Sequence, residues 1–164
     1  MGVAYPYPPH HPRLSYVGKH AYFLTFSTRA RRPLFAAPPH VTLVCAQILR
    51  AAREQSFEIT AYCYMPDHVH LLVSGVTDTS DCLRFVKAAK QYSGYYFQQA
   101  YEQRLWERYG FERAIRDDIE RASVIGYIVS NPVRAGLVSD PRDYPYLGSQ
   151  RYTVSELMEI CEYR

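Results

Sequence analysis

The alternation of hydrophobic and polar residues along the chain predicts several β-strands. Residues 20–28 combine aromatic and hydroxyl side chains, and residues 59–65 and 68–73 are apolar runs of strand length. Pro66 and Asp67 separate the second and third runs, and these residue types favour the two central positions of a turn. The sequence therefore predicts a hairpin of two antiparallel strands.

Elsewhere, apolar residues recur every three to four positions, which is the spacing of a helix with one buried face. The helices predicted in this way cover residues 41–55, 81–101 and 117–131, and a short one begins at residue 153. Residues suited to cap the last three helices are Ser80 or Asp81, Asp117 and Thr153. Because proline cannot donate a helical hydrogen bond, Pro132 is expected to end the third helix near Asn131.

A further strand over residues 111–115 gives the order strand, helix, strand, strand, helix, strand, helix. Such an order is typical of an antiparallel sheet with helices packed on one face, so we expect an α+β fold of the ferredoxin-like type. Residues 1–13 carry four prolines and are predicted to form an irregular N-terminal arm. Residues 14–150 then form the domain, and residues 151–164 form a C-terminal helical tail.

Composition and charge restrict the class of protein only partly. No run of the sequence approaches the roughly 20 apolar residues that cross a membrane, so we expect no membrane partner. The first residues lack the basic and then apolar pattern of a secretory signal, which favours the cytoplasm. The net charge of +3 permits a polyanionic partner such as nucleic acid without requiring one.

The first candidate for chemistry is the pair His68 and His70. Residues two apart on a strand point to the same face, so both imidazoles should project together. Two neighbouring imidazoles can hold one divalent cation. The alternative is that both histidines simply occupy a polar sheet face.

The second candidate is the helix that contains Tyr127 and Asn131. These residues are four apart and therefore lie one turn from each other on the same helix face. A tyrosine can act as a nucleophile, and the amide oxygen of asparagine can bind a hard cation. The alternative is structural, with Tyr127 covering the edge of the core and Asn131 ending the helix. Glu120, on the same helix, is a candidate general base.

The third candidate is a group of basic residues near aromatic ones. Arg84, Lys87 and Lys90 recur at helical spacing and precede several tyrosines, which suits a surface that follows phosphates and stacks on bases. A basic loop with Arg29, Arg31 and Arg32 follows the first strand. The alternative is a solvated helix face beside a core aromatic cluster.

Taken together, these motifs resemble a known family. The segment from Tyr64 to Val73, Tyr-Met-Pro-Asp-His-Val-His-Leu-Leu-Val, is similar to the hairpin and HUH motif (His, hydrophobic, His) of single-tyrosine transposases. The segment from Tyr127 to Val138, Tyr-Ile-Val-Ser-Asn-Pro-Val-Arg-Ala-Gly-Leu-Val, resembles REP-associated tyrosine transposases, in the IS200-like transposase family. The resemblance spans roughly residues 16–148 and departs from many relatives at Asp67, where they have asparagine.

The resemblance implies a function and a set of site residues. It implies a metal-dependent endonuclease and strand-transferase that cuts single-stranded DNA beside hairpins or palindromes through a 5′-phosphotyrosine. Tyr127 matches the nucleophile, His68 and His70 match metal ligands, Asn131 is expected to complete the site, and the metal is Mg²⁺ or Mn²⁺. The basic residues expected to contact DNA are Arg29, Arg31, Arg32, Arg84, Lys87, Lys90 and Arg134. Such a protein would act as a monomer or homodimer in a prokaryotic cytoplasm, with the chromosomal DNA.

Two other functions are compatible with the same residues. One is a catalytically silent protein that binds hairpin or single-stranded DNA. The other is a metal-dependent hydrolase of a small phosphoester, which would leave the basic and aromatic surface without a role. A covalent adduct with DNA would distinguish the transposase-like enzyme from both.

Overall fold

The structure is a computed structural model that describes residues 16–163, so the predicted arm over residues 1–13 lies outside the described residues. The strands are β1 (Ala21–Ser27), β2 (Phe57–Met65), β3 (His68–Gly75), β4 (Phe111–Ile115) and β5 (Leu147–Gly148). The helices are α1 (Pro38–Glu54), α2 (Cys82–Tyr101), α3 (Asp118–Arg134) and α4 (Val154–Ile160). In this part of the chain no helix is long and apolar enough to cross a membrane.

The five strands form one antiparallel sheet in the order β4-β1-β3-β2-β5. The hairpin of β2 and β3 turns at Pro66 and Asp67, as predicted. The first four strands alternate with α1 and α2 in the ferredoxin-like order β-α-β-β-α-β, which confirms the predicted α+β class. The short strand β5, which the sequence analysis missed, extends the sheet beyond β2.

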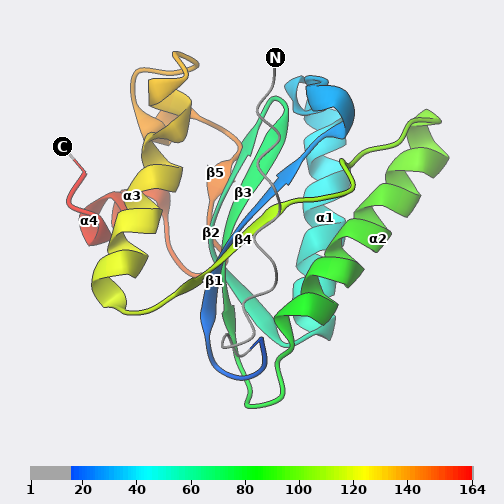
Figure 1. Cartoon of the computed structure of the whole chain (residues 1–164). Coiled ribbons are helices and arrows are strands. Elements are labelled where there is room, and N and C mark those ends of the chain that lie inside the picture. The colour runs from blue at the N-terminus through cyan, green and yellow to red at the C-terminus, as the bar shows by residue number, and fades with distance from the viewer. Residues whose placement is uncertain (1–15, 164) are drawn as a thin grey trace, which may run out of the picture.

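Helices cover both faces of the sheet, which corrects the prediction that they pack on one face (Figure 1). Helices α1 and α2 cover one face, where apolar side chains of β1, β2 and β3 form the larger core cluster. Helices α3 and α4 cover the other face through a second cluster that contains Phe23, Leu72 and Ile128. The prediction failed because it placed the third helix on the same face as the two crossover helices, whereas α3 follows the β-α-β-β-α-β unit and returns to the other face.

Helix α3 continues past Asn131 to Arg134 and contains Pro132, which corrects the predicted end of the helix. Proline loses one hydrogen bond to the preceding turn but leaves the carbonyl groups free to accept bonds from later residues. The amide of Ala135 donates to the carbonyl of Asn131, and the amide of Leu137 donates to that of Pro132. Gly136, at a φ of 73°, ends the helix in the left-handed conformation that glycine adopts without strain.

The predicted helix caps are confirmed. The carboxylates of Asp81 and Asp117 accept hydrogen bonds from backbone amides three residues later in α2 and α3. Thr153 and Glu156 form a capping box at the start of α4. Local polar sequence therefore sets where these helices begin.

Candidate active site

The two histidines of β3 lie on the sheet face that α3 covers, with their rings turned toward each other. The Nε2 atoms of His68 and His70 are 3.1 Å apart, and the ring centroids are 4.6 Å apart. On the opposite face of the same strand, Val69, Leu71 and Val73 pack in the core. The predicted placement of both imidazoles on one face is thus confirmed.

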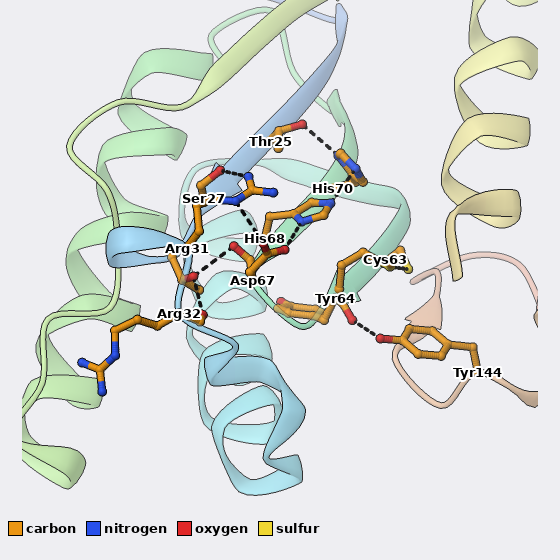
Figure 2. Close-up of polar contacts among 12 residues, drawn as sticks. Thr25, Ser27, Arg31, Arg32, Cys63, Tyr64, Asp67, His68, His70 and Tyr144 are labelled. Carbon is orange, nitrogen blue, oxygen red and sulfur yellow. Dashed lines mark hydrogen bonds and ion pairs between the residues drawn. The ribbon is translucent and has the colours of Figure 1, made fainter. Parts of the chain in front are cut away.

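The second ring nitrogen of each histidine contacts an oxygen atom (Figure 2). The Nδ1 atom of His70 lies 2.8 Å from Oγ1 of Thr25, which stands opposite it in β1. The Nδ1 atom of His68 lies 2.7 Å from Oδ1 of Asp67. Contacts of this kind fix the ring orientation and tautomer of metal-binding histidines, and they direct both Nε2 atoms into the same space. Thr25 cannot be identified from the sequence, because only the strand register places it beside His70.

Asp67 is held in turn by the basic loop after β1. The Nε atom of Arg31 lies 3.0 Å from Oδ2 of Asp67, and its guanidinium also donates to Oγ of Ser27 (Figure 2). Burial would raise the pKa of Asp67, but His68 and Arg31 outweigh that effect and hold the pKa below its usual value. A charged carboxylate therefore orients His68.

Both imidazoles are neutral at ordinary pH. Burial lowers the pKa of each ring, and His70 is only 5% exposed. The neighbouring His68 ring and the positive charges of Arg134 and Arg31 add to the effect of burial and bring the pKa of His70 to about 3. Neutral imidazoles keep the nitrogen lone pair that a metal ion requires.

Tyr127 reaches the histidines from α3. Its ring centroid lies 5.3 Å from that of His70 and 5.8 Å from that of Phe23. The guanidinium carbon of Arg134 lies 4.4 Å from the centre of the same ring. Tyr127 is 42% exposed, so a large substrate can reach it. An exposed tyrosine, two imidazoles and a positive charge thus meet within one chain.

Asn131 and Glu120 lie on α3, on either side of Tyr127 along the helix. Asn131 is one turn beyond Tyr127 and is 8% exposed, so it belongs to the buried side of the helix. Glu120 lies about two turns before Tyr127, where its carboxylate forms ion pairs with Arg113 and Arg116. The backbone amide of Arg116 and the guanidinium groups of Arg116 and Arg113 hold the pKa of Glu120 below its usual value. Because Glu120 lies two turns from Tyr127 and is engaged by these arginines, it is not placed to accept the phenolic proton.

The donor atoms present fit a divalent metal ion. Adjacent ligands at metal–nitrogen bonds of about 2.1 Å would stand about 3 Å apart, close to the observed separation of the Nε2 atoms. Among residues 16–163 there is no cluster of three His, Cys, Asp or Glu side chains that could hold a metal. Within these residues, a further protein ligand would be of another type, such as an amide oxygen, with further oxygens from substrate or water.

Comparison with known proteins identifies the family. The sequence profile described as "Transposase IS200 like" matches residues 16–128. The chain belongs to the IS200-like transposase family. This finding confirms the resemblance drawn from the HUH segment.

Relatives of this IS200-like chain include two proteins described as REP-associated tyrosine transposases. One, from Haemophilus influenzae, is 31% identical over 62% of this chain, and the match spans 64% of that protein's own length. The other, from Escherichia coli K12, is 29% identical over 82% of this chain and 79% of its own length.

Two solved structures share the fold. A REP-associated tyrosine transposase bound to a REP hairpin superposes with a TM-score of 0.72 and 24% identity, over 87% of each chain. A structure described as a transposase from Deinococcus radiodurans superposes with a TM-score of 0.54 and 27% identity, over 70% of this chain and 92% of its own.

The basic residues predicted to contact DNA do not form one surface on this IS200-like domain. Arg31 and Arg134 lie at the histidine and tyrosine cluster, while the exposed Arg32 side chain points away from it (Figure 2). Arg84 and Lys87 are exposed on α2, which covers the opposite face of the sheet.

Lys90 differs from the other predicted DNA contacts because its ammonium group points inward. The Nζ atom donates to the carbonyl of Glu107 at 2.9 Å, lies near that of Arg108, and sits over the ring of Phe26. Burial lowers its pKa. We therefore correct its assignment: Lys90 joins α2 to the segment before β4, and its ammonium group is not free to follow a DNA strand.

Proposed function

We propose that this chain is a metal-dependent endonuclease and strand-transferase that cuts single-stranded DNA beside a hairpin and forms a 5′-phosphotyrosine intermediate. The observation that carries the proposal is the contact of the Tyr127 ring with His70, beside two converging imidazole nitrogens. A tyrosine nucleophile next to a metal site is an arrangement suited to phosphoryl transfer. The solved relative bound to a REP hairpin supports hairpin DNA as the substrate class.

In this proposal His68, His70 and Asn131 hold Mg²⁺ or Mn²⁺. When bound, the cation offsets the negative charge that develops on the scissile phosphate. Thr25 and Asp67 keep the two imidazoles oriented, and the low pKa of His70 keeps its nitrogen unprotonated. Imidazole ligands also suit zinc, so the preference for Mg²⁺ or Mn²⁺ comes from the family resemblance and the oxygen ligands.

The phenolic oxygen of Tyr127 attacks phosphorus, and the bond from phosphorus to the 3′-oxygen breaks. The 3′-oxygen leaves and takes up a proton, while the phenolic proton passes to water at the exposed edge of the side chain. A later 3′-hydroxyl can attack the phosphotyrosine and restore both the phosphodiester and the tyrosine. The covalent bond conserves the energy of the phosphodiester, so joining needs no other energy source.

Arg134 has two tasks in this mechanism. Its guanidinium lies over the Tyr127 ring, which restricts the ring to the side of the site that faces His70. Its positive charge, next to the proposed nucleophile, would also offset negative charge on the phosphate under attack. Removal of Arg134 should therefore slow cleavage more than it weakens DNA binding.

We propose that Tyr127 acts at the histidines of its own chain, because one chain brings both together. A mixture of Tyr127→Phe and His70→Ala proteins should then form no more covalent adduct than either variant alone. Recovery of adduct in the mixture would show instead that two copies exchange their tyrosines.

The decisive test is incubation with labelled hairpin DNA carrying a single-stranded extension, in Mn²⁺, followed by denaturing electrophoresis. The wild type should form a covalent adduct, and Tyr127→Phe should lower its yield by about three orders of magnitude or more while the fold and DNA binding persist. His68→Ala, His70→Ala or excess chelator should also prevent cleavage. DNA binding without any adduct would favour the catalytically silent alternative, and an adduct from Tyr127→Phe would move the assignment to another tyrosine.

A further inference from the structure

A second concentration of positive charge lies outside the cluster of histidines and tyrosine. Arg29, Arg104 and Arg108 line a groove of about 390 Å³ together with Gly94, Gln98, Leu105 and Trp106. All three arginines are exposed. The groove forms where the C-terminal half of α2, the turn after β1 and the segment before β4 meet, at one end of the molecule (Figure 1). Of these three arginines, only Arg29 was predicted from the sequence to contact DNA.

The arginines of the groove have no carboxylate partner among residues 16–163. Glu107 lies in the same segment, but its carboxylate accepts a hydrogen bond from the backbone amide of Ala30. By contrast, Arg31, Arg84, Arg113, Arg116, Arg142 and Arg151 all have acidic partners. Three exposed guanidinium groups outnumber the single carboxylate of Glu107 in this segment, so the groove carries net positive charge that attracts an anion with several charges.

Backbone hydrogen bonds join the groove to the β2–β3 hairpin, which carries His68 and His70. The amide of Arg29 donates to the carbonyl of Leu105 at 2.8 Å, and Thr28 pairs with Trp106. The amide of Thr28 donates to the carbonyl of Asp67 at 2.9 Å, and Asp67 contacts His68. A polyanion bound in the groove would therefore be held at a fixed position relative to the histidines.

We propose that this groove binds the phosphodiester backbone of the DNA substrate outside the bond that is cut. The inference rests on the proposed function for its substrate class. The floor of the groove suits a backbone because Gly94 contributes no side chain and Trp106 is turned inward, donating from Nε1 to Oγ of Ser93. Guanidinium groups bind phosphate oxygens in pairs, so spaced arginines follow a backbone without reading its sequence.

The test measures binding affinity against salt concentration in the absence of metal, with single-stranded DNA and with a hairpin. Arg29→Gln, Arg104→Gln and Arg108→Gln should each lower the slope of log affinity against log salt by about 0.7 on a single strand or about 0.9 on a duplex. The control is Lys19→Gln, which removes one charge beyond the other end of β1, about 20 Å or more away. The DNA form that shows the larger loss of salt slope in the arginine variants identifies whether the single strand or the hairpin stem lies in the groove.

Gly94 offers a matched pair of variants that leaves the arginines in place. A Cβ atom at this position would meet Trp106 at an ordinary distance of 3.8 Å, so a side chain fits. Gly94→Glu places a negative charge on the groove floor and should weaken DNA binding at least tenfold more than Gly94→Gln, which has the same size.

Two results would overturn the inference. One is an unchanged salt slope in all three arginine variants, and the other is an equal loss of slope in Lys19→Gln. Because binding is measured without metal, these outcomes are independent of whether the wild type forms a covalent adduct. A result that contradicts DNA binding in the groove can thus be distinguished from one that contradicts the proposed endonuclease activity.

Discussion

The two faces of the sheet carry different kinds of residue, although the same strands supply both. On the α1 and α2 face, the described side chains of β1 and β3 are apolar and closely packed. On the α3 face, the same strands present Thr25, His68 and His70 beside the apolar Phe23 and Leu72. The first face is a continuous apolar core, and the second combines an apolar core with the polar side chains proposed to take part in cleavage. Variants of neighbouring residues that point to opposite faces can separate these two tasks.

The largest effect on stability is expected from Leu71→Ala and Leu72→Ala, a matched pair of fully buried leucines on opposite faces. Each should lower the free energy of unfolding by about 2–5 kcal/mol, measured by denaturant titration. Leu72 packs in the cluster that contains α3, so its loss should also slow cleavage per folded molecule by about tenfold or more. Equal cleavage by both variants would contradict the proposed division between the faces.

Thr25→Val should affect stability less and should act mainly on the metal requirement of cleavage. The substitution keeps the shape of the side chain but removes the contact with Nδ1 of His70. The metal concentration that gives half-maximal cleavage should rise about 10–100-fold, as for other residues that orient a metal ligand. Thr25→Ser retains the hydroxyl and should restore a nearly normal metal requirement. If valine and serine behave alike, Thr25 does not position His70.

The low pKa of His70 predicts a loss of stability in acid for the metal-free protein. Below about pH 6.5 the unfolded chain takes up a proton that folded His70 does not, and this continues down to about pH 3. At pH 5 the loss from His70 should be about 2 kcal/mol relative to pH 7, and His70→Gln should lose less stability than the wild type by about this amount. Melting curves in chelator would measure this, with His20→Gln as an exposed control. An identical pH dependence in His70→Gln and wild type would contradict the assignment.

The smallest effect on stability is expected at Asn131. Asn131→Ala should cost about 1 kcal/mol, as for one lost hydrogen bond, while raising the metal concentration needed for cleavage. Asn131→Asp offers a charged oxygen of similar shape and should keep some cleavage with a changed preference between Mg²⁺ and Mn²⁺. Metal titrations of cleavage, run beside thermal melts, distinguish a metal-ligand role of Asn131 from a structural one. A structural role would give a large loss of stability and an unchanged metal dependence.

The local sequence was sufficient to predict most of the elements and the orientation of the histidines. The period of two in β3 assigns His68 and His70 to one face, and Pro66-Asp67 sets the hairpin that precedes them. The caps at Asp81, Asp117 and Thr153 involve residues only three apart, so they also follow from sequence alone. The end of α3 was predicted wrongly, because the loss of one proline hydrogen bond was given more weight than the carbonyl groups that still accept bonds.

What only the tertiary structure decided are the contacts between segments far apart in the chain. The pairing of β1 with β3 places Thr25 beside His70, and the packing of α3 on the second face brings Tyr127 to the same ring. The groove between Arg29 and Arg104 likewise needs the segment after α2 to lie against the turn after β1. The sequence by itself determined the residue types and their local periods, because these depend on backbone geometry over a few residues. The relative positions of distant residues depend on strand register and helix packing, which a local pattern does not specify.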